Sequence, residues 1–207
     1  MNFITFTIGI ILFTCIVSFS AFRSPKILND LIMSPYLVKE NKQWYRFVTS
    51  GFLHADLMHL LFNMFVLYMF GQQIVEPGCE QLSGRWMFPV LYFGGMIAAD
   101  VTSYFKHKDN PEYRSLGASG AVSAVVFAGI LFYPTMKMGF FIIPPIIPAY
   151  IFGPLYLLYC VYAAKQNTDN INHDAHFWGA VFGLVFPIVL HPFLFKRMIA
   201  LITDSFM

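Results

Sequence analysis

The sequence predicts an all-α membrane protein, a bundle of six transmembrane helices with a long, structured first loop. Two observations support this fold class. Only 12% of the 207 residues are charged and 57% are hydrophobic, whereas a soluble domain has roughly 25% charged residues. The apolar residues also gather in six segments, each close to the roughly 20 residues that cross a bilayer as a helix.

The six apolar segments are distributed along the whole chain. We expect the helices at residues 3–22, 57–75, 86–105, 118–133, 146–164 and 176–195. The first segment carries no charge before Arg23, and a cleaved signal peptide ending near Ser18 and Ser20 is the alternative interpretation. A basic start is lacking and the apolar stretch is long, which favours a membrane anchor.

The rest of the chain fits a single membrane domain over residues 1–207. Proline and glycine separate the apolar segments, for example at Pro77-Gly78 and Pro134. No fixed-period repeat or soluble domain is left over. The connection from Arg23 to Leu53 is long for a helical bundle, and loops of this length usually carry structure or function.

Charge and cysteine content exclude other classes of protein. A net charge of +2 gives no basic field, so nucleic acid is not expected as a partner. The cysteines Cys15, Cys79 and Cys160 lie far apart and form no CxxC pair, so we expect them to be unpaired. No cofactor is predicted.

Polar residues gather at the starts of the second, fourth and sixth segments. In a six-helix topology these three starts lie on the same side of the membrane. Polar side chains inside a bilayer are costly, so they usually face the bundle interior and often mark function. The groups concerned are His54, Asp56, His59 and Asn63, then Gly117 to Gly120, and finally Asn172 to His176.

Helical spacing brings some of these groups together. His59 and Asn63 are four residues apart and therefore share a helix face. His176, Gly179 and Gly183 share another face, and a matching stripe of small residues follows Gly120. Small residues let two helices approach closely. A close crossing would bring Ser119 towards His176, as nucleophilic serine catalysis requires.

At these residues the sequence resembles a known family. HLLFN (59–63), GASG (117–120) and HFWGAVFG (176–183) resemble the HxxxN, GxSG and HxxGxxxG signatures of rhomboid intramembrane serine proteases. The cluster of Trp44, Tyr45 and Arg46 is similar to the Trp-Arg loop element of that family, with a tyrosine inserted. The resemblance covers nearly the whole chain, in the order of the family.

The resemblance implies a role for each motif. Ser119 would be the nucleophile and His176 the general base, in a dyad without a third carboxylate. The oxyanion hole would consist of His59, Asn63 and the backbone N–H groups of Ser119 and Ala118. Supporting structural roles would fall to Gly117, Gly120, Gly179, Gly183, Trp44, Arg46 and His54.

Two positions depart from the family pattern. The glutamate of the family follows a glycine at four residues, whereas Gly71 and Glu76 are five apart, which leaves the role of Glu76 open. Many relatives place a tyrosine that packs on the catalytic histidine at the position of Ser123. We expect Tyr92, Trp178 or a backbone carbonyl to orient His176 instead.

Neighbouring polar residues have simpler interpretations. We expect His173 to be a solvated loop residue and Asp100 to be a polar group facing the membrane interface. Asp174 is only two residues from His176 and would point elsewhere on a helix, so it is not assigned as a third catalytic residue. His54 and His59 cannot share a ligand face and no HExxH motif is present, so no metal site is predicted.

The resemblance implies a serine endopeptidase that cleaves transmembrane protein substrates in or near the lipid bilayer. The alternative is an inactive rhomboid-like protein that binds or remodels membrane clients, as Derlin-type relatives lacking the dyad illustrate. A channel or transporter is disfavoured, because no charge lies mid-membrane and no repeat is visible. The sequence does not predict the oligomeric state.

Orientation in the membrane is the point on which two arguments disagree. Lys and Arg are more numerous in the loops before the second, fourth and sixth segments, and the positive-inside rule would place that side in the cytoplasm. The family resemblance implies the reverse. We adopt the family orientation, because most of these charges lie in the long first loop. The expected location is a prokaryotic cell (inner) membrane, with the site open to the non-cytoplasmic side.

Overall fold

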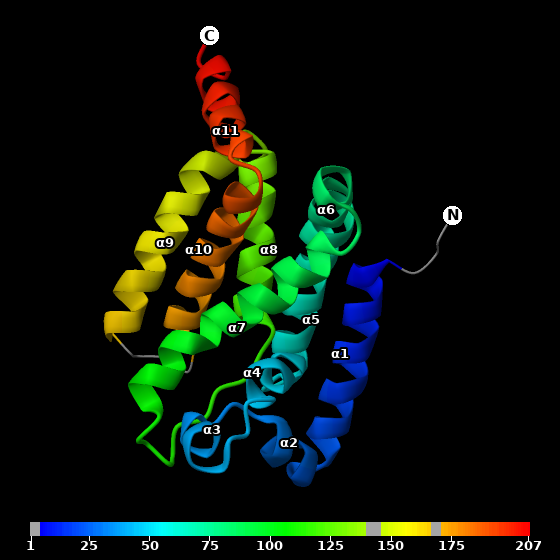
Figure 1. Ribbon diagram of the computed structural model, residues 1–207, viewed down its shortest axis with the longest axis vertical. Coiled ribbons are helices and arrows are strands. Elements are labelled where there is room, and N and C mark those ends of the chain that lie inside the picture. Colours follow the sequence, from blue (N-terminus) through cyan, green and yellow to red (C-terminus); the bar gives the residue numbers. More distant parts are fainter. Residues whose placement is uncertain (1–4, 140–145, 167–170) are drawn as a thin grey trace.

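The computed structural model describes residues 5–139, 146–166 and 171–207 and confirms the predicted all-α membrane bundle (Figure 1). Long helices lie side by side, and α8 runs through their middle. The bounds of the six long helical segments are α1 (Phe6–Arg23), α5 (Leu57–Val66) continued by η2 (Leu67–Val75) and α6 (Glu76–Ser83), α7 (Met87–His107), α8 (Ser119–Phe132), α9 (Ala149–Gln166) and α10 (His173–Leu190).

Three of the described helices are long and apolar enough to span a membrane by length and composition: α1, the continuous segment Leu57–Ser83, and α10. The helix α8 is shorter and apolar, and most of its side chains are buried. It packs against α7 and α10, which shield it on both sides. A helix that is enclosed in this way has little contact with lipid, so its small residues serve close packing.

The last helical segment differs from the prediction. We predicted one helix over residues 176–195, but α10 ends at Leu190 and a separate helix α11 (Phe193–Asp204) follows. Proline at position 192 has no backbone N–H and disfavours the helical conformation of the residue before it, so the helix stops there. The start of the first predicted segment, residues 3–4, lies outside the described residues.

The first loop is structured, as predicted. It folds into α2 (Pro25–Leu31), α3 (Pro35–Asn41), α4 (Arg46–Thr49) and the 3₁₀ helix η1 (Ser50–Phe52). Both α2 and α3 begin with a serine whose hydroxyl caps the helix and with proline at the first helical position, which are strong start signals.

Arg46 lies inside this loop and not at the lipid interface. Its side chain is only 3% exposed. The guanidinium donates hydrogen bonds to the carbonyl oxygens of Asn29 and Ile32 and to the side chain of Gln43, at 2.9, 2.6 and 2.7 Å. Trp44 is half exposed and its ring packs near Phe47, with 6.1 Å between the ring centroids. Arg46 thereby joins segments of the first loop that are far apart in sequence.

The five-residue spacing between Gly71 and Glu76 is accommodated by a change of helix type. The segment η2 is a π-helix, and the backbone N–H of Glu76 donates to the carbonyl oxygen of Gly71, five residues earlier. A π-helical turn takes one residue more than an α-helical turn. The extra residue is therefore absorbed within the helix, and Glu76 still points to the core.

Glu76 caps the first turn of α1. Its carboxylate is buried and accepts hydrogen bonds from the backbone N–H groups of Phe6 and Thr7, at 2.7 and 2.9 Å, and from the Thr7 hydroxyl, at 2.6 Å. A negative charge at a helix N-terminus satisfies amides that have no partner within the helix and interacts favourably with the helix dipole. The role of Glu76 that the sequence left open is this attachment of α1 to the second membrane segment.

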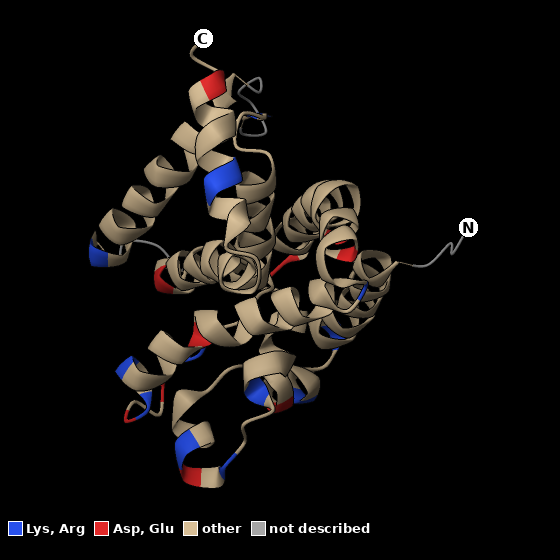
Figure 2. Ribbon diagram, turned by 45° about the horizontal axis from the view of Figure 1, so that its top comes forward, with Lys and Arg blue, Asp and Glu red and all other residues tan. Residues whose placement is uncertain are grey.

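The charged residues are unevenly distributed. Many of them gather at one end of the molecule, around α2 to α4 and in the turn between α7 and α8 (Figure 2). An exposed ion pair between Lys39 and Asp109, with 2.7 Å between Nζ and Oδ1, joins these two regions. The helices α5, α8 and α10 all begin at this end (Figure 1). A short antiparallel pair, β1 (Lys137–Met138) and β2 (Ile147–Pro148), lies between α8 and α9 in the sequence.

Candidate active site

The starts of α8 and α10 bring a serine and a histidine into contact. Ser119 is the first residue of α8, and His176 lies in the first turn of α10. The distance from His176 Nε2 to Ser119 Oγ is 2.7 Å. Both residues are partly exposed. The pair therefore has the hydrogen bond that lets a histidine take a proton from an attacking serine.

Glycines set the distance between these two helices. A Cβ atom on Gly179 would lie 2.1 Å from the carbonyl oxygen of Gly120, and one on Gly183 would lie 2.1 Å from that of Ala124. A Cβ on Gly120 would in turn lie 2.4 Å from the Cβ of Ala99 on α7. The backbones of α8 and α10 touch at these positions, and no larger residue fits without moving a helix.

Gly117 shapes the chain just before Ser119. Its φ of +123° lies in a region that side chains disfavour. A Cβ atom there would lie 2.9 Å from His59 Cε1, 3.1 Å from His59 Nε2 and 3.9 Å from Ser119 Oγ. The His59 ring therefore lies over Gly117, beside the Ser119 hydroxyl.

Asn63 is held one helical turn after His59. Its side-chain amide donates to the backbone carbonyl oxygen of His59 at 2.9 Å, and the residue is only 4% exposed. An asparagine amide has a second N–H. The start of α5 is fixed by Asp56, whose carboxylate accepts from the His59 backbone N–H at 2.8 Å.

His54 connects α1 to the backbone just before Ser119. The Ser18 hydroxyl donates to the Phe52 carbonyl oxygen at 2.8 Å, so His54 Nδ1, 2.9 Å from the same hydroxyl, is the donor to it. His54 Nε2 then accepts from the Ala118 backbone N–H at 3.5 Å. Burial lowers the pKa of His54, which lies outside the membrane-spanning helices, to about 3. The imidazole is therefore neutral, as this arrangement requires.

This contact bears on the predicted oxyanion hole. The Ala118 amide is directed at His54, so it is not a donor to a group held by Ser119. The first amides of a helix have no partner within it, and the N–H of Ser119 is one of these for α8. The expectation from the family resemblance that the Ala118 N–H belongs to the oxyanion hole is therefore wrong, because this N–H donates to His54.

Tyr156 on α9 contacts the side chain of His176 and orients its ring. Its hydroxyl oxygen is 3.3 Å from His176 Nδ1 and 3.3 Å from Ser123 Oγ. Of the groups predicted to orient His176, Tyr92 is excluded, because its buried hydroxyl has no hydrogen-bond partner among the described residues; Trp178 and a backbone carbonyl stay predictions. The small Ser123 side chain thus leaves room for a tyrosine from a different helix. No local pattern in the sequence marks Tyr156, since only packing decides which face of α9 meets α10.

Asn172 fixes the start of α10. Its side-chain oxygen accepts from the Ala175 backbone N–H at 3.1 Å. Its amide nitrogen donates to Ser103 Oγ at 2.9 Å and to the Tyr113 hydroxyl at 3.2 Å. Sequence reasoning did not assign this residue a role, although an asparagine directly before an apolar helix is a recognisable start signal.

Two acidic residues, Asp174 and Asp100, lie near the Ser119–His176 pair. Asp174 forms an ion pair with Lys106, with 2.5 Å between Oδ2 and Nζ, and is not assigned as a third catalytic residue. Asp100 was predicted to face the membrane interface, and this prediction is wrong. It lines a cavity of about 20 Å³ together with Ser119, and its carboxylate accepts from the Ser50 hydroxyl at 3.4 Å. The cavity has room for about one water molecule.

His173 also differs from its prediction. We expected a solvated loop residue, but His173 is the first residue of α10 and only 4% exposed. Its ring lies edge-on to the ring of Tyr159, with 5.5 Å between the centroids. The packing of α9 against α10 buries it.

Comparison with known proteins places these features in context. A family model described as Rhomboid domain matches residues 41–193. The chain is 31% identical over 176 residues to Rhomboid-like protein 11, chloroplastic, of Arabidopsis thaliana, which covers 78% of this chain and 58% of that protein. It is 34% identical over 140 residues to Presenilin-associated rhomboid-like protein A, mitochondrial, of Danio rerio, covering 66% of this chain and 35% of that protein.

A bacterial protein is similar as well. YdcA of Bacillus subtilis (strain 168), whose name proposes a rhomboid protease, is 30% identical over 100 residues, covering 48% of this chain and 47% of that protein. The chain thus spans less than two thirds of the length of each of these relatives. Two of these names refer to a chloroplast and a mitochondrion, and the third protein comes from a bacterium. The relatives therefore support a membrane protein and do not support a prokaryotic location in particular.

Proposed function

The chain belongs to the rhomboid family, and we propose that it is an intramembrane serine endopeptidase that uses a Ser119–His176 dyad. The observation that carries this proposal is the 2.7 Å contact between His176 Nε2 and Ser119 Oγ. Glycines at the α8–α10 crossing permit the close approach of the two helices that carry this pair. A serine that served only as a small packing residue would not need a histidine at this distance.

Acylation begins when Ser119 Oγ attacks the carbonyl carbon of the scissile peptide bond. His176 Nε2 takes the hydroxyl proton, and its Nδ1–H donates to the Tyr156 hydroxyl, which keeps the ring in the required tautomer. His176 then gives the proton to the leaving amine. A water molecule, activated by the same histidine, hydrolyses the acyl-enzyme and releases the second product.

The negative charge on the tetrahedral intermediate needs donors that are fixed in advance. We assign this role to the Ser119 backbone N–H and to the His59 and Asn63 side chains. The His59 ring lies over Gly117, beside the nucleophile, and Asn63 is anchored to the His59 carbonyl oxygen. Loss of one such donor typically lowers kcat by about 100- to 1000-fold.

The substrates of this reaction are transmembrane proteins. A peptide carbonyl within a membrane helix is already hydrogen-bonded, so the substrate must unwind before Ser119 can attack it. We therefore expect a small residue at the cleavage point and helix-breaking residues nearby. Since Ser119 begins α8 at the charged end of the bundle, cleavage takes place close to one membrane surface.

For the orientation we propose that the site opens to the non-cytoplasmic side, in a prokaryotic cell membrane. The orientation rests on the family resemblance and on the folded first loop, whose internal bonds fix part of its basic charge. A reporter fused to the C-terminus tests it. A C-terminus on the non-cytoplasmic side would overturn the orientation.

The proposed activity is tested by cleavage of a model transmembrane substrate in proteoliposomes. The wild-type protein should cleave it and Ser119→Ala should not, and a fluorophosphonate probe should label the wild-type serine alone. Equal cleavage by both proteins would end the serine hypothesis, and loss of activity with a chelator would point to a metal. A wild type that binds the substrate without cleaving it or taking the probe would establish the alternative, an inactive client-binding protein.

A further inference from the structure

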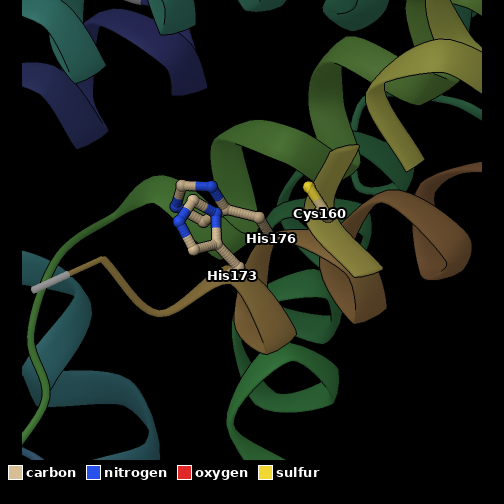
Figure 3. Close-up of side chains that lie close together, drawn as sticks. All are labelled: Cys160, His173 and His176. Carbon is tan, nitrogen blue, oxygen red and sulfur yellow. The ribbon is translucent and has the colours of Figure 1, made fainter. Parts of the chain in front are cut away.

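Three metal-binding side chains meet behind the catalytic histidine. Cys160 on α9 and His173 and His176 on α10 each offer one ligand atom, and these atoms lie within 4.8 Å of one another. Figure 3 shows the thiol of Cys160 beside the two imidazole rings. Cys160 and His173 are 1% and 4% exposed, and His176 is partly exposed.

We assign Nδ1 as the His176 nitrogen that would bind a metal in this cluster, because Nε2 is engaged by Ser119. His176 Nε2 is occupied by Ser119 Oγ at 2.7 Å, and its Nδ1 is 3.3 Å from the Tyr156 hydroxyl. Cys160 follows Tyr156 by one turn of α9, on the same face. The ring of His173 lies edge-on to that of His176, with 6.0 Å between the centroids. The cluster therefore touches the catalytic histidine on the side away from the nucleophile.

We propose that Cys160, His173 and His176 form an inhibitory zinc site. One thiolate and two imidazoles are ligands that Zn²⁺ prefers, and a water molecule would complete the tetrahedron. Ideal tetrahedral zinc holds such ligand atoms about 3.3 to 3.6 Å apart. From separations within 4.8 Å, a contraction of at most about 1.2 to 1.5 Å by side-chain rotation reaches this geometry.

Zinc at this site would disable the general base, an inference that rests on the proposed function. The Cys160 thiol loses its proton to solvent as the sulfur–zinc bond forms. His176 binds zinc through the Nδ1 lone pair, so the proton that Nδ1 carried moves to Nε2. An Nε2–H group donates to Ser119 Oγ and has no lone pair to accept its proton. Ser119 and His176 then remain in contact, but His176 can no longer take the proton from the Ser119 hydroxyl.

The location of the cluster suits a ligand that arrives from water. Cys160 lies near the end of α9 and His173 and His176 lie at the start of α10, at the same end of the bundle as the polar first loop (Figure 1). A zinc ion with one thiolate retains a single positive charge, which costs less to bury than a free dication. Inhibition should therefore respond to zinc on the side of the membrane to which the site opens.

The test uses the full-length protein in detergent, purified with a tag that lacks histidine. Zinc should inhibit cleavage of the model substrate, and a chelator should restore it. Cys160→Ala should keep basal cleavage and need about 10- to 100-fold more zinc for half inhibition, because loss of a ligand weakens zinc at least as much as loss of a second-shell partner. Cys79→Ala is the matched control, since Cys79 is equally buried but lies on α6, and it should match the wild type.

Cobalt binding gives a readout that does not depend on cleavage. Co²⁺ added to the wild type should produce a thiolate-to-cobalt charge-transfer band, which zinc displaces, and Cys160→Ala should lack that band. Equal zinc inhibition of wild type and Cys160→Ala, or a cobalt spectrum without a thiolate band, would overturn the zinc site. A thiolate band in a wild type that cleaves nothing would support the site and refute the proposed protease. Cys160→Ser serves as the second variant if the alanine variant melts early.

Discussion

In the proposed protease, adding one methyl group to Gly179 should strongly lower the activity without changing Ser119 or His176. In Gly179→Ala the new Cβ would lie 2.1 Å from the carbonyl oxygen of Gly120. An ordinary contact between carbon and oxygen is about 3.3 Å, so α10 must move away from α8 by about 1 Å. The carbonyl belongs to helix backbone and cannot rotate away, so the helices themselves must separate.

The size of the expected loss in rate follows from the position of His176 on the helix that must move. His176 lies one turn before Gly179 on α10, and its Nε2 is 2.7 Å from Ser119 Oγ. A misplacement of about 1 Å costs roughly 100-fold in rate. Overpacking should also lower the free energy of unfolding by about 1 to 3 kcal/mol, partly offset by the better helix propensity of alanine, roughly 1 kcal/mol.

The assay compares kcat for the model substrate in proteoliposomes and the thermal melt in detergent. Gly9→Ala on α1 is the matched control, because its Cβ would have nothing within 4 Å. This control should keep wild-type activity and melt at the same or a higher temperature. Wild-type kcat in Gly179→Ala would show that the crossing tolerates separation, and the reasoning would be refuted.

Two further predictions concern the groups that support the dyad. Tyr156→Phe removes the hydroxyl beside His176 Nδ1 and should lower kcat about tenfold, with KM and the thermal melt nearly unchanged; an unchanged kcat would contradict its role. The lowered pKa of His54 means that the unfolded chain binds a proton between pH 6.5 and about 3 that the folded protein does not. The contribution of His54 to the free energy of unfolding should therefore be fully present above pH 6.5. It should be lost progressively as the pH falls, with about 2 kcal/mol lost near pH 5. Melts across this range should show a shallower dependence in His54→Gln, and equal slopes would contradict the assignment.

Much of the fold could be predicted because lipid imposes a simple rule on the chain. Spans must be apolar and about 20 residues long, so they are visible in the sequence. The two serine–proline pairs that begin α2 and α3 are equally local signals. The break at Pro192 was missed because the apolar pattern continues across it, although proline itself marks it.

The candidate site was predicted in part for the same reason. His59, Asn63, Ser119 and His176 stand out because polar groups are rare in apolar segments. Tyr156 does not stand out, because α9 carries several tyrosines and only its packing decides which of them meets His176. Asp100 was misplaced on similar grounds, since its position in α7 did not show that it lines the cavity beside Ser119.

By itself the sequence determined the apolar spans, the gathering of polar groups at one end of the bundle and the small residues that let α8 and α10 touch. Each of these depends on periodicity or on the cost of polar groups in lipid, which act locally. Tertiary structure alone decided that η2 is π-helical, which directs Glu76 to the start of α1. It also decided that Tyr156 of α9 lies between Ser123 and His176, and that Cys160 lies beside His173 and His176. These features depend on how one helix is rotated against another, and that rotation follows from the packing of all the helices together.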